Sequence, residues 1–507
     1  MRKALLLLAL IPCILSAQEV SDRSKLNLSL LRAPWAAASN AAGLAFSPLA
    51  EFNTLGVQYE LQDGDARPMQ TGTRVSDIRF DTQGSRQIGK MQVWGRFRYD
   101  NISDTGSSFN TLLYDPFDER FMYTAADTVA GKWKKQSYDM QFKAAMPISE
   151  SFAAGLHVRY TDRIAAAQID PRAESYHYCV NVKPSLVWKV GSSTVGLSGQ
   201  YANTFERSTP SISNSQEIQK VFLMRGLGNW VGEQVGGSGL GTMYFRCNTW
   251  GGALQYGFKG GCDLFSELSW AHHSTAVTES PTQPKPHGST VRNEYALRSG
   301  AILENGVTLH RIALDASLSF TRGIEPTAMW NTATGCWEVQ AELEQCLLRT
   351  AGATLAYHLY RLEEARYRAH WYAELGFEDK ADSYATPASV FAYDNVLAAV
   401  GTERRFALGH GSLLAGATVK GAKNVHAEYS YTGHRAGTAP VRELYPHNLA
   451  VFAADRIQGT ISAEYAFPVS SGASLAFCLE GSGTASFSKD YGTLHRLAVL
   501  AAVKLYF

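Results

Sequence analysis

The end of the chain decides the predicted fold. Residues 495–507 read HRLAVLAAVKLYF, in which apolar side chains recur at every second position. The apolar positions are Leu497, Val499, Ala501, Val503, Leu505 and Phe507. Because successive side chains of a β-strand point to opposite faces, this period of two predicts a strand with one apolar face and one mixed face.

The same alternation extends back to about residue 52. Clear copies lie at 91–99, 138–144, 156–160, 367–377 and 457–467. Counting such segments predicts about eighteen strands, an even number typical of barrels, with fourteen or sixteen as alternatives. The sequence therefore predicts an all-β fold built from antiparallel strands.

The predicted connections differ in length at the two ends of the strands. Tight turns, for example at 149–151 and 409–411, alternate with long connections. The long connections are predicted near 102–136, 207–248, 279–292, 323–350, 379–393 and 432–454. A soluble sandwich also has alternating strands, but short turns alternating with long outer loops are typical of bacterial outer-membrane barrels. We therefore predict a transmembrane antiparallel β-barrel over residues 52–507, closed because lipid would leave an open edge unpaired.

Composition narrows the classes of partner and excludes helical spans. The chain has 47 Lys and Arg against 46 Asp and Glu, a net charge of +1, and 18% of its residues are charged. A nucleic-acid partner normally requires clustered excess positive charge, so none is predicted. No uninterrupted apolar run of about 18 residues follows Ala17, so the sequence predicts no membrane-spanning helix.

The N-terminus has the pattern of an export signal. Two basic residues precede an apolar run at 4–15, and the small residues that follow predict cleavage after Ala17. Residues 1–17 are therefore expected to be a signal peptide that directs the chain to the bacterial outer membrane. Residues 18–51 lack sustained alternation, and they are expected to form either a partial plug of the barrel mouth or a periplasmic lead-in.

The last two residues are predicted to serve insertion. The chain ends on Tyr506 and Phe507 within the last strand, which resembles the C-terminal aromatic signature by which outer-membrane barrels are recognised. The resemblance implies an encounter with the barrel-assembly machinery, followed by contact with outer-membrane lipid and lipopolysaccharide. A second outer-membrane protein is the remaining candidate partner.

Charged residues on the mixed faces are predicted to line the barrel lumen. The predicted lining residues are Arg96, Arg98, Lys143, Arg159, Lys183, Arg366, Arg368, Glu374, Glu464, Arg496 and Lys504. Rings of charge set solute preference in pores, so a basic excess would favour anions. Alternatively, these groups pair across neighbouring strands and only fill the interior.

No catalytic, cofactor or metal site is predicted. Cys336 and Cys346 flank a short segment expected in a surface loop, where they either form a disulfide or remain free. No spacing of cysteine and histidine suggests a set of metal ligands. His272, His273 and Ser274 could in principle supply a base and a nucleophile. However, adjacent side chains on a strand point to opposite faces and the sequence shows no acid to assist the histidine beside Ser274, so no catalytic role is predicted.

Two resemblances to known barrels add to this prediction. Residues 39–45, Ser-Asn-Ala-Ala-Gly-Leu-Ala, look like the Asn-Pro-Ala-Gly signature of the long-chain fatty-acid transporter superfamily, with Ala41 at the usual proline position. That superfamily implies an N-terminal segment that plugs the lumen. Along its whole length the chain resembles an uncharacterised, porin-like family of outer-membrane barrels from Bacteroidota, which implies fold and location but no substrate.

Two functional hypotheses follow from the predicted barrel. The first is a passive channel or transporter for small solutes, either anion-leaning or suited to hydrophobic compounds. The second is a non-conducting surface scaffold or accessory subunit whose long loops bind a partner in the outer membrane. An open lumen favours the first hypothesis, and stable co-purification with another outer-membrane protein favours the second.

Overall fold

The computed structural model describes residues 21–214, 216, 219–235 and 240–507. The predicted signal peptide at 1–17 lies outside the described residues. Within the described ranges, no helix is both long enough and apolar enough to cross a membrane.

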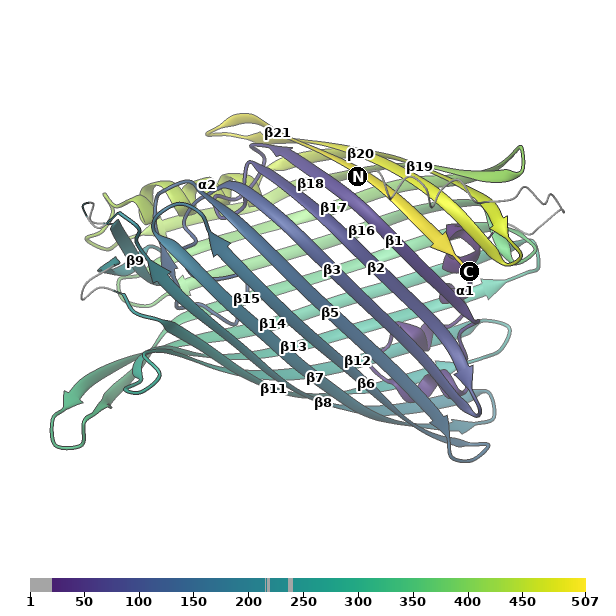
Figure 1. Cartoon of the computed structure of the whole chain (residues 1–507), viewed down its shortest axis with the longest axis horizontal. Helices are drawn as coiled ribbons and strands as arrows, with labels where there is room; N and C mark the ends of the chain where they lie inside the picture. The colour runs from purple at the N-terminus through teal and green to yellow at the C-terminus, as the bar shows by residue number, and fades with distance from the viewer. Residues whose placement is uncertain (1–20, 215, 217–218, 236–239) are drawn as a thin grey trace, which may run out of the picture.

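The chain forms a barrel of eighteen antiparallel strands (Figure 1). The barrel strands are β1 (Phe52–Gly64), β2 (Arg74–Ile88), β3 (Met91–Ser107), β5 (Gly131–Pro147), β6 (Phe152–Ala167), β7 (Arg172–Val190), β8 (Ser193–Ser211), β11 (Met243–Phe258), β12 (Asp263–Glu279), β13 (Lys285–Glu304), β14 (Thr308–Asn331), β15 (Cys336–Glu363), β16 (Arg366–Tyr384), β17 (Ser389–Leu408), β18 (Gly411–Tyr431), β19 (Asp455–Ser470), β20 (Ala473–Ser488) and β21 (Gly492–Tyr506). The predicted all-β, antiparallel barrel with eighteen strands is confirmed.

The barrel closes where its last strand meets its first. Strand β21 pairs with β1 along a register that runs from Thr54 opposite Tyr506 to Gly64 opposite Arg496. Beyond this register, the N–H of Phe507 donates to the Asn53 carbonyl at 3.0 Å. Closure pairs the backbone groups that an open sheet would leave exposed at its edges.

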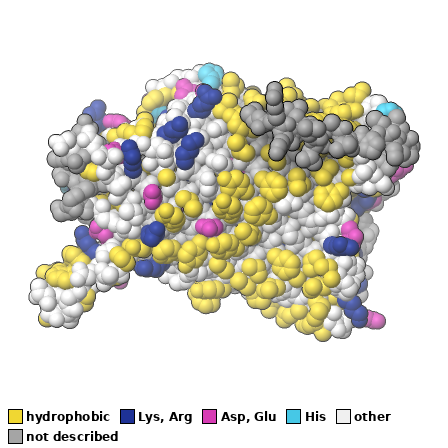
Figure 2. Space-filling view, viewed as in Figure 1, with side chains coloured by type: hydrophobic (Ala, Val, Ile, Leu, Met, Phe, Trp, Pro, Cys, Tyr) yellow, Lys and Arg dark blue, Asp and Glu magenta, His cyan; other side chains and the backbone are white. Residues whose placement is uncertain are grey.

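The outside of the barrel wall is apolar. Leu254 lies directly opposite Leu197 on one neighbouring strand and Leu268 on the other. Their exposed fractions are 59%, 56% and 55%, so this row of leucines points away from the interior. Figure 2 shows such apolar side chains gathered over the middle of the wall.

The two ends of the barrel differ. The turn end carries short connections, such as the one between β7 and β8 at 191–192 and the one between β17 and β18 at 409–410. The opposite, loop end carries the longer connections, and it lies at the left of Figure 1. The chain terminus at Phe507 lies at the turn end, at the right of the figure.

Three of the predicted long loops are wrong, because strands occupy most of them. The predicted loop at 323–350 is the hairpin of β14 and β15, which turns at 332–335. Similarly, strands cover most of the predicted loops at 279–292 and 379–393. Both faces of β15 are exposed from Val339 to Glu344, so this part of the strand has no buried face to produce apolar alternation.

Cys336 and Cys346 do not form the disulfide that was one of the two expectations. Both thiols are free, Cys336 exposed at the hairpin tip and Cys346 buried. The two residues lie on the same strand, β15. A strand rises about 3.3 Å per residue, so their Cα atoms lie far beyond the separation that a disulfide spans.

Candidate functional site

The N-terminal segment, residues 21–51, lies inside the turn end of the barrel. It contains the helix α1 (Arg23–Leu31) and the short 3-10 helices η1 (Pro34–Ala36) and η2 (Ala41–Ala45). Asp22 caps α1, because its carboxylate accepts a hydrogen bond from the Lys25 N–H at 3.1 Å. In Figure 1 α1 appears at the right, beside the C-terminus.

Asp22 fastens the start of this segment to the wall. Its carboxylate accepts from Arg405 of β17 at 3.0 Å and from Ser412 of β18 at 2.9 Å. Burial opposes the ionised carboxylate, but hydrogen bonds from Ser24, Ser412 and Arg405 outweigh burial and lower the pKa of Asp22. The segment therefore begins at a buried, charged anchor.

Further polar contacts join the segment to strands around the barrel. Arg23 pairs with Glu403 of β17 at 2.7 Å, and Arg32 pairs with Glu304 of β13 at 2.6 Å. The remaining contacts are Ser21 with Ser474 of β20, Ser39 with Glu267 of β12, Asn40 with Gln255 of β11, Ala42 with Ser185 of β7, and the carbonyls of Ala36 and Ala38 with Lys143 of β5. The segment therefore contacts strands on many sides of the lumen.

Apolar packing holds the middle of the segment. Trp35 is buried and meets Phe265 of β12 edge to face, with ring centroids 5.2 Å apart. A Cβ on Gly43 would lie 1.9 Å from Trp35 Cε3, and a Cβ on Gly155 of β6 would lie 2.3 Å from the Ala42 nitrogen. Only glycine allows these approaches, so both positions fit the segment tightly into the barrel.

The loop end is filled by a second group of segments, here termed the loop-end cap, residues 108–130, 219–235 and 432–454. The cap contains a small sheet of β4 (Ala125–Ala126), β9 (Gln219–Gly226) and β10 (Asn229–Val235), together with the π-helix η3 (Pro440–Leu444) and the helix α2 (Tyr445–Phe452). Buried apolar side chains join the cap to the wall. They include Leu112, Leu113, Phe121, Tyr123, Val221 and Leu223 of the cap and Met243, Phe245 and Val277 of the wall.

Glu119 joins the cap to two strands of the wall. Its carboxylate bonds to Lys380 of β16 at 2.8 Å and also to Arg292 of β13. Burial opposes the ionised form, but Lys380 and Arg292 lower the pKa of Glu119. Elsewhere Ser208 of β8 donates to the Leu112 carbonyl at 2.7 Å.

Five of the eleven predicted lining residues have acidic partners within the described part of the chain. Arg96 pairs with Asp81 at 2.6 Å and Arg98 with Asp100 at 3.0 Å. Arg159 pairs with Asp139, and Lys504 lies 3.6 Å from Glu464. Arg366 lies 4.0 Å from Asp22, whereas Lys143 donates to backbone carbonyls of the N-terminal segment.

The remaining predicted residues are more dispersed. Lys183 and Glu374 line separate interior cavities, and Arg496 donates to Gln62 at 3.1 Å. Arg368 is exposed, at the point where the register between β15 and β16 shifts. Tyr506 donates to Glu464 at 3.1 Å. Sequence reasoning missed Asp22, Glu119 and Arg405, because contacts between segments hundreds of residues apart leave no local pattern.

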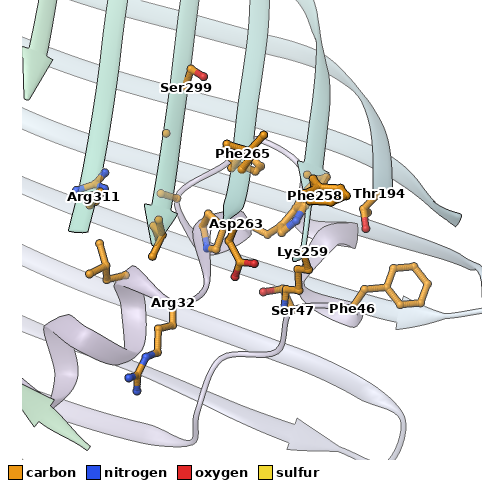
Figure 3. A pocket seen from close by; sticks show the side chains of 18 of the residues that line it. Arg32, Phe46, Ser47, Thr194, Phe258, Lys259, Asp263, Phe265, Ser299 and Arg311 are labelled. Atoms are coloured by element: carbon orange, nitrogen blue, oxygen red, sulfur yellow. The ribbon is translucent and has the colours of Figure 1, made fainter. Parts of the chain in front are cut away.

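A cavity of about 530 Å³ lies between the N-terminal segment and the wall; we call it the turn-end cavity. Its larger apolar side chains include Leu30, Leu31, Trp35, Phe46, Phe258, Phe265 and Ile302. Its charged side chains are Arg32, Lys189, Lys259, Asp263, Arg298 and Arg311. Figure 3 shows Phe258, Phe265 and Arg311 on the wall, and Arg32 and Phe46 on the N-terminal segment.

Basic groups dominate the charge of the turn-end cavity. Arg32 is paired with Glu304, and Arg298 contacts Asp315 at 3.1 Å. The side chains of Lys189, Lys259 and Arg311 form no ion pair with any residue that the structure describes. All three side chains line the same cavity. No group of three or more His, Cys, Asp or Glu side chains suited to a metal ion occurs in the described chain.

The sequence matches a known family over most of its length. The family model "Family of unknown function (DUF6850)" matches residues 41–507. The chain belongs to the DUF6850 family. A comparison with curated proteins gives no match.

Several solved structures are similar to the DUF6850 chain at very low identity. The ferric preacinetobactin receptor BauA from Acinetobacter baumannii has a TM-score of 0.43 at 9% identity, covering 90% of this chain and 80% of that chain. The outer membrane transporter YddB from Escherichia coli has a TM-score of 0.41 at 7% identity, covering 90% and 81%. The deltaS2S3 mutant of the monoaromatic hydrocarbon channel TodX has a TM-score of 0.32 at 12% identity, covering 92% of each chain.

Proposed function

We propose that the protein spans the bacterial outer membrane and carries a small solute through a lumen that its own segments obstruct at both ends. Location is supported by the barrel itself. Closure lets backbone N–H and C=O groups at the two ends of the sheet pair with each other, as a bilayer requires. Rows such as Leu197, Leu254 and Leu268 place apolar side chains on the outside of the wall. The turn end would face the periplasm, because outer-membrane barrels keep their short connections there.

The observation that carries the transport proposal is the closed barrel of eighteen strands, which is wide enough to enclose a channel. Both ends of its lumen are occupied, so transport requires that an occupant moves. The N-terminal segment contacts strands from β5 to β20 at the turn end, and the loop-end cap contacts β8, β13 and β16 at the other. An open general pore would not need either occupant. We therefore favour a transporter in which one or both occupants move, over a permanently open channel.

The contacts around the lumen do not favour a simple preference for anions. Arg96, Arg98 and Arg159 are each paired with an aspartate, so their charges are largely compensated. Selectivity would then arise at localised sites rather than from an overall basic lining. We also propose that the chain is related to a Bacteroidota family of barrels and to the long-chain fatty-acid transporter superfamily. The position of residues 39–45 inside the barrel supports the relation to that superfamily.

A surface scaffold is the second candidate function. The hairpin of β14 and β15 extends past its neighbours at the loop end, at the lower left of Figure 1. Near its tip Met329, Trp330 and Val339 are exposed, with Trp330 and Trp337 rings 5.7 Å apart. An outer-membrane partner protein could bind there while the lumen stays shut.

Conductance of four chains in planar bilayers tests the transport proposal. The chains are the wild type, a variant without residues 22–49, a variant with linkers in place of 109–127, 219–235 and 433–453, and the combination of both changes. We expect little conductance from the wild type and large, steady steps from the combined variant, because a barrel of this size without occupants encloses an aqueous channel. A combined variant that inserts correctly but shows no conductance would contradict the proposal. Stable co-purification of the wild type with another outer-membrane protein would then favour the scaffold.

A further inference from the structure

We propose that the turn-end cavity is a binding site for a small organic anion with an apolar body, such as an aryl carboxylate. The inference deepens the proposed function by naming a solute class, and it rests on that function only for the role of the site in transport. Binding itself depends on the cavity alone.

The size of the turn-end cavity suits one small molecule. Its volume of about 530 Å³ falls within the range of ligand pockets, which is roughly 300–1,000 Å³. Such pockets are largely apolar and carry a few polar groups that fix orientation. The interior cavity nearer the middle of the wall, about 430 Å³, lacks comparable aromatic walls, although Phe377 borders it.

The walls of the turn-end cavity favour an apolar, flat body. Trp35 and Phe265 meet edge to face on one side, and Phe46 and Phe258 also line the space. Aromatic side chains prefer offset or edge-to-face contact with another ring. An aromatic or branched aliphatic group would bury apolar surface here that water otherwise contacts.

The charges of the turn-end cavity select an anion. Five basic side chains and a single carboxylate, Asp263, line it. Asp263 accepts from the Gly260 N–H at 3.1 Å, and two of the five cations have acidic partners. Lys189, Lys259 and Arg311 therefore leave positive charge available beside an apolar surface. A carboxylate would accept charge-assisted hydrogen bonds from these groups.

The site also joins two parts of the molecule. Arg32, Trp35 and Phe46 belong to the N-terminal segment, whereas Lys259, Phe265 and Arg311 belong to the wall or its turns. An anion in the cavity contacts both, so its binding would respond to the position of the segment. A ligand that binds only one arrangement of the segment favours that arrangement in proportion to its differential affinity.

Binding of 2-naphthoate to the protein in lipid nanodiscs tests the proposal, with empty nanodiscs as the blank. The uncharged 2-naphthol serves as the isosteric probe. We expect saturable binding of 2-naphthoate to the wild type, with K259Q and R311Q each weakening it roughly tenfold, the scale of one charge-assisted hydrogen bond. K489Q is the matched control, because Lys489 is exposed in the connection between β20 and β21 at the loop end. It should bind 2-naphthoate like the wild type.

Two results would overturn the site. One is the absence of saturable 2-naphthoate binding to folded wild type, and the other is equal binding by K259Q, R311Q and K489Q. Stronger saturable binding of 2-naphthol than of 2-naphthoate would also overturn the choice of an anion. Uptake of 2-naphthoate into proteoliposomes separates the proposed site from the proposed transport function. Binding without uptake would support the site and argue against transport. Uptake that is unchanged in K259Q would argue against the site and support transport.

Discussion

Asp127 shows how one carboxyl group in the loop-end cap makes stability depend on pH. Its side chain accepts from Thr111 Oγ1 at 2.8 Å and from the Val129 N–H at 2.7 Å. Burial nevertheless dominates and raises the pKa of Asp127 to about 6, from a usual value of 3.8. Glu119 differs, because Lys380 and Arg292 lower its pKa.

The pH dependence of the cap follows from the sign of that shift. Between about pH 4 and 6 the closed cap holds a proton on Asp127 that the open cap has lost, so stability of the cap falls as pH rises through this window. We expect amide-exchange protection over 109–127, corrected for intrinsic exchange, to be greater at about pH 5 than at about pH 7. D127N should remove this difference, and an unchanged difference in D127N would show that another group causes it.

A substitution at Gly43 tests how tightly the N-terminal segment packs inside the barrel. Gly43→Ala would place the new carbon 1.9 Å from Trp35, so the segment must shift. We expect the variant to lose about 1–3 kcal/mol of docking stability, as overpacked sites do, seen as faster chymotrypsin cleavage within residues 23–46. Gly437→Ala is the control, because its Cβ would meet no atom within 4 Å. Equal cleavage in both variants would contradict the tight fit.

At the scale of elements, the strands were predictable and their ends were not. A strand in the wall repeats apolar and mixed side chains, as 495–507 does, because its two faces meet different surroundings. That contrast vanishes beyond the wall, so the β14 and β15 hairpin was predicted as a loop. The turn-end cavity could not be predicted from the sequence either, because Trp35 and Phe265 meet only after the N-terminal segment enters the barrel.

The N-terminal segment depends on its buried anchor. Arg405→Met would leave Asp22 buried without its principal cation, a change that typically costs about 3–5 kcal/mol for a buried pair. We expect the segment to become accessible to chymotrypsin while the barrel remains folded. Lys423→Met is the comparison, because its ion pair with Asp455 is exposed and should be worth no more than about 1 kcal/mol. The idea fails if the two variants are cleaved at the same rate.

At the scale of the whole molecule, closure makes the wall one cooperative unit. The seam between β1 and β21 joins the two ends of the sheet, so no barrel strand is lost without opening its neighbours. We expect the unheated protein to migrate faster in detergent gels than the boiled protein, because the closed barrel stays compact until heating unfolds it. Identical mobility of both samples, together with soluble fractionation, would count against a membrane barrel.

The contacts of the N-terminal segment with the last strands also imply an order of folding. The first described residues of the chain form hydrogen bonds with its last strands. The Ser21 N–H donates to Ser474 of β20, and the Arg23 N–H donates to Glu464 of β19. The Glu464 carboxylate also accepts from Tyr506 of β21. This docking surface does not exist until β19, β20 and β21 have joined the sheet. The N-terminal segment, which is synthesised early, can therefore dock only after the last strands have joined the sheet, and the newly closed barrel is empty at its turn end until it does.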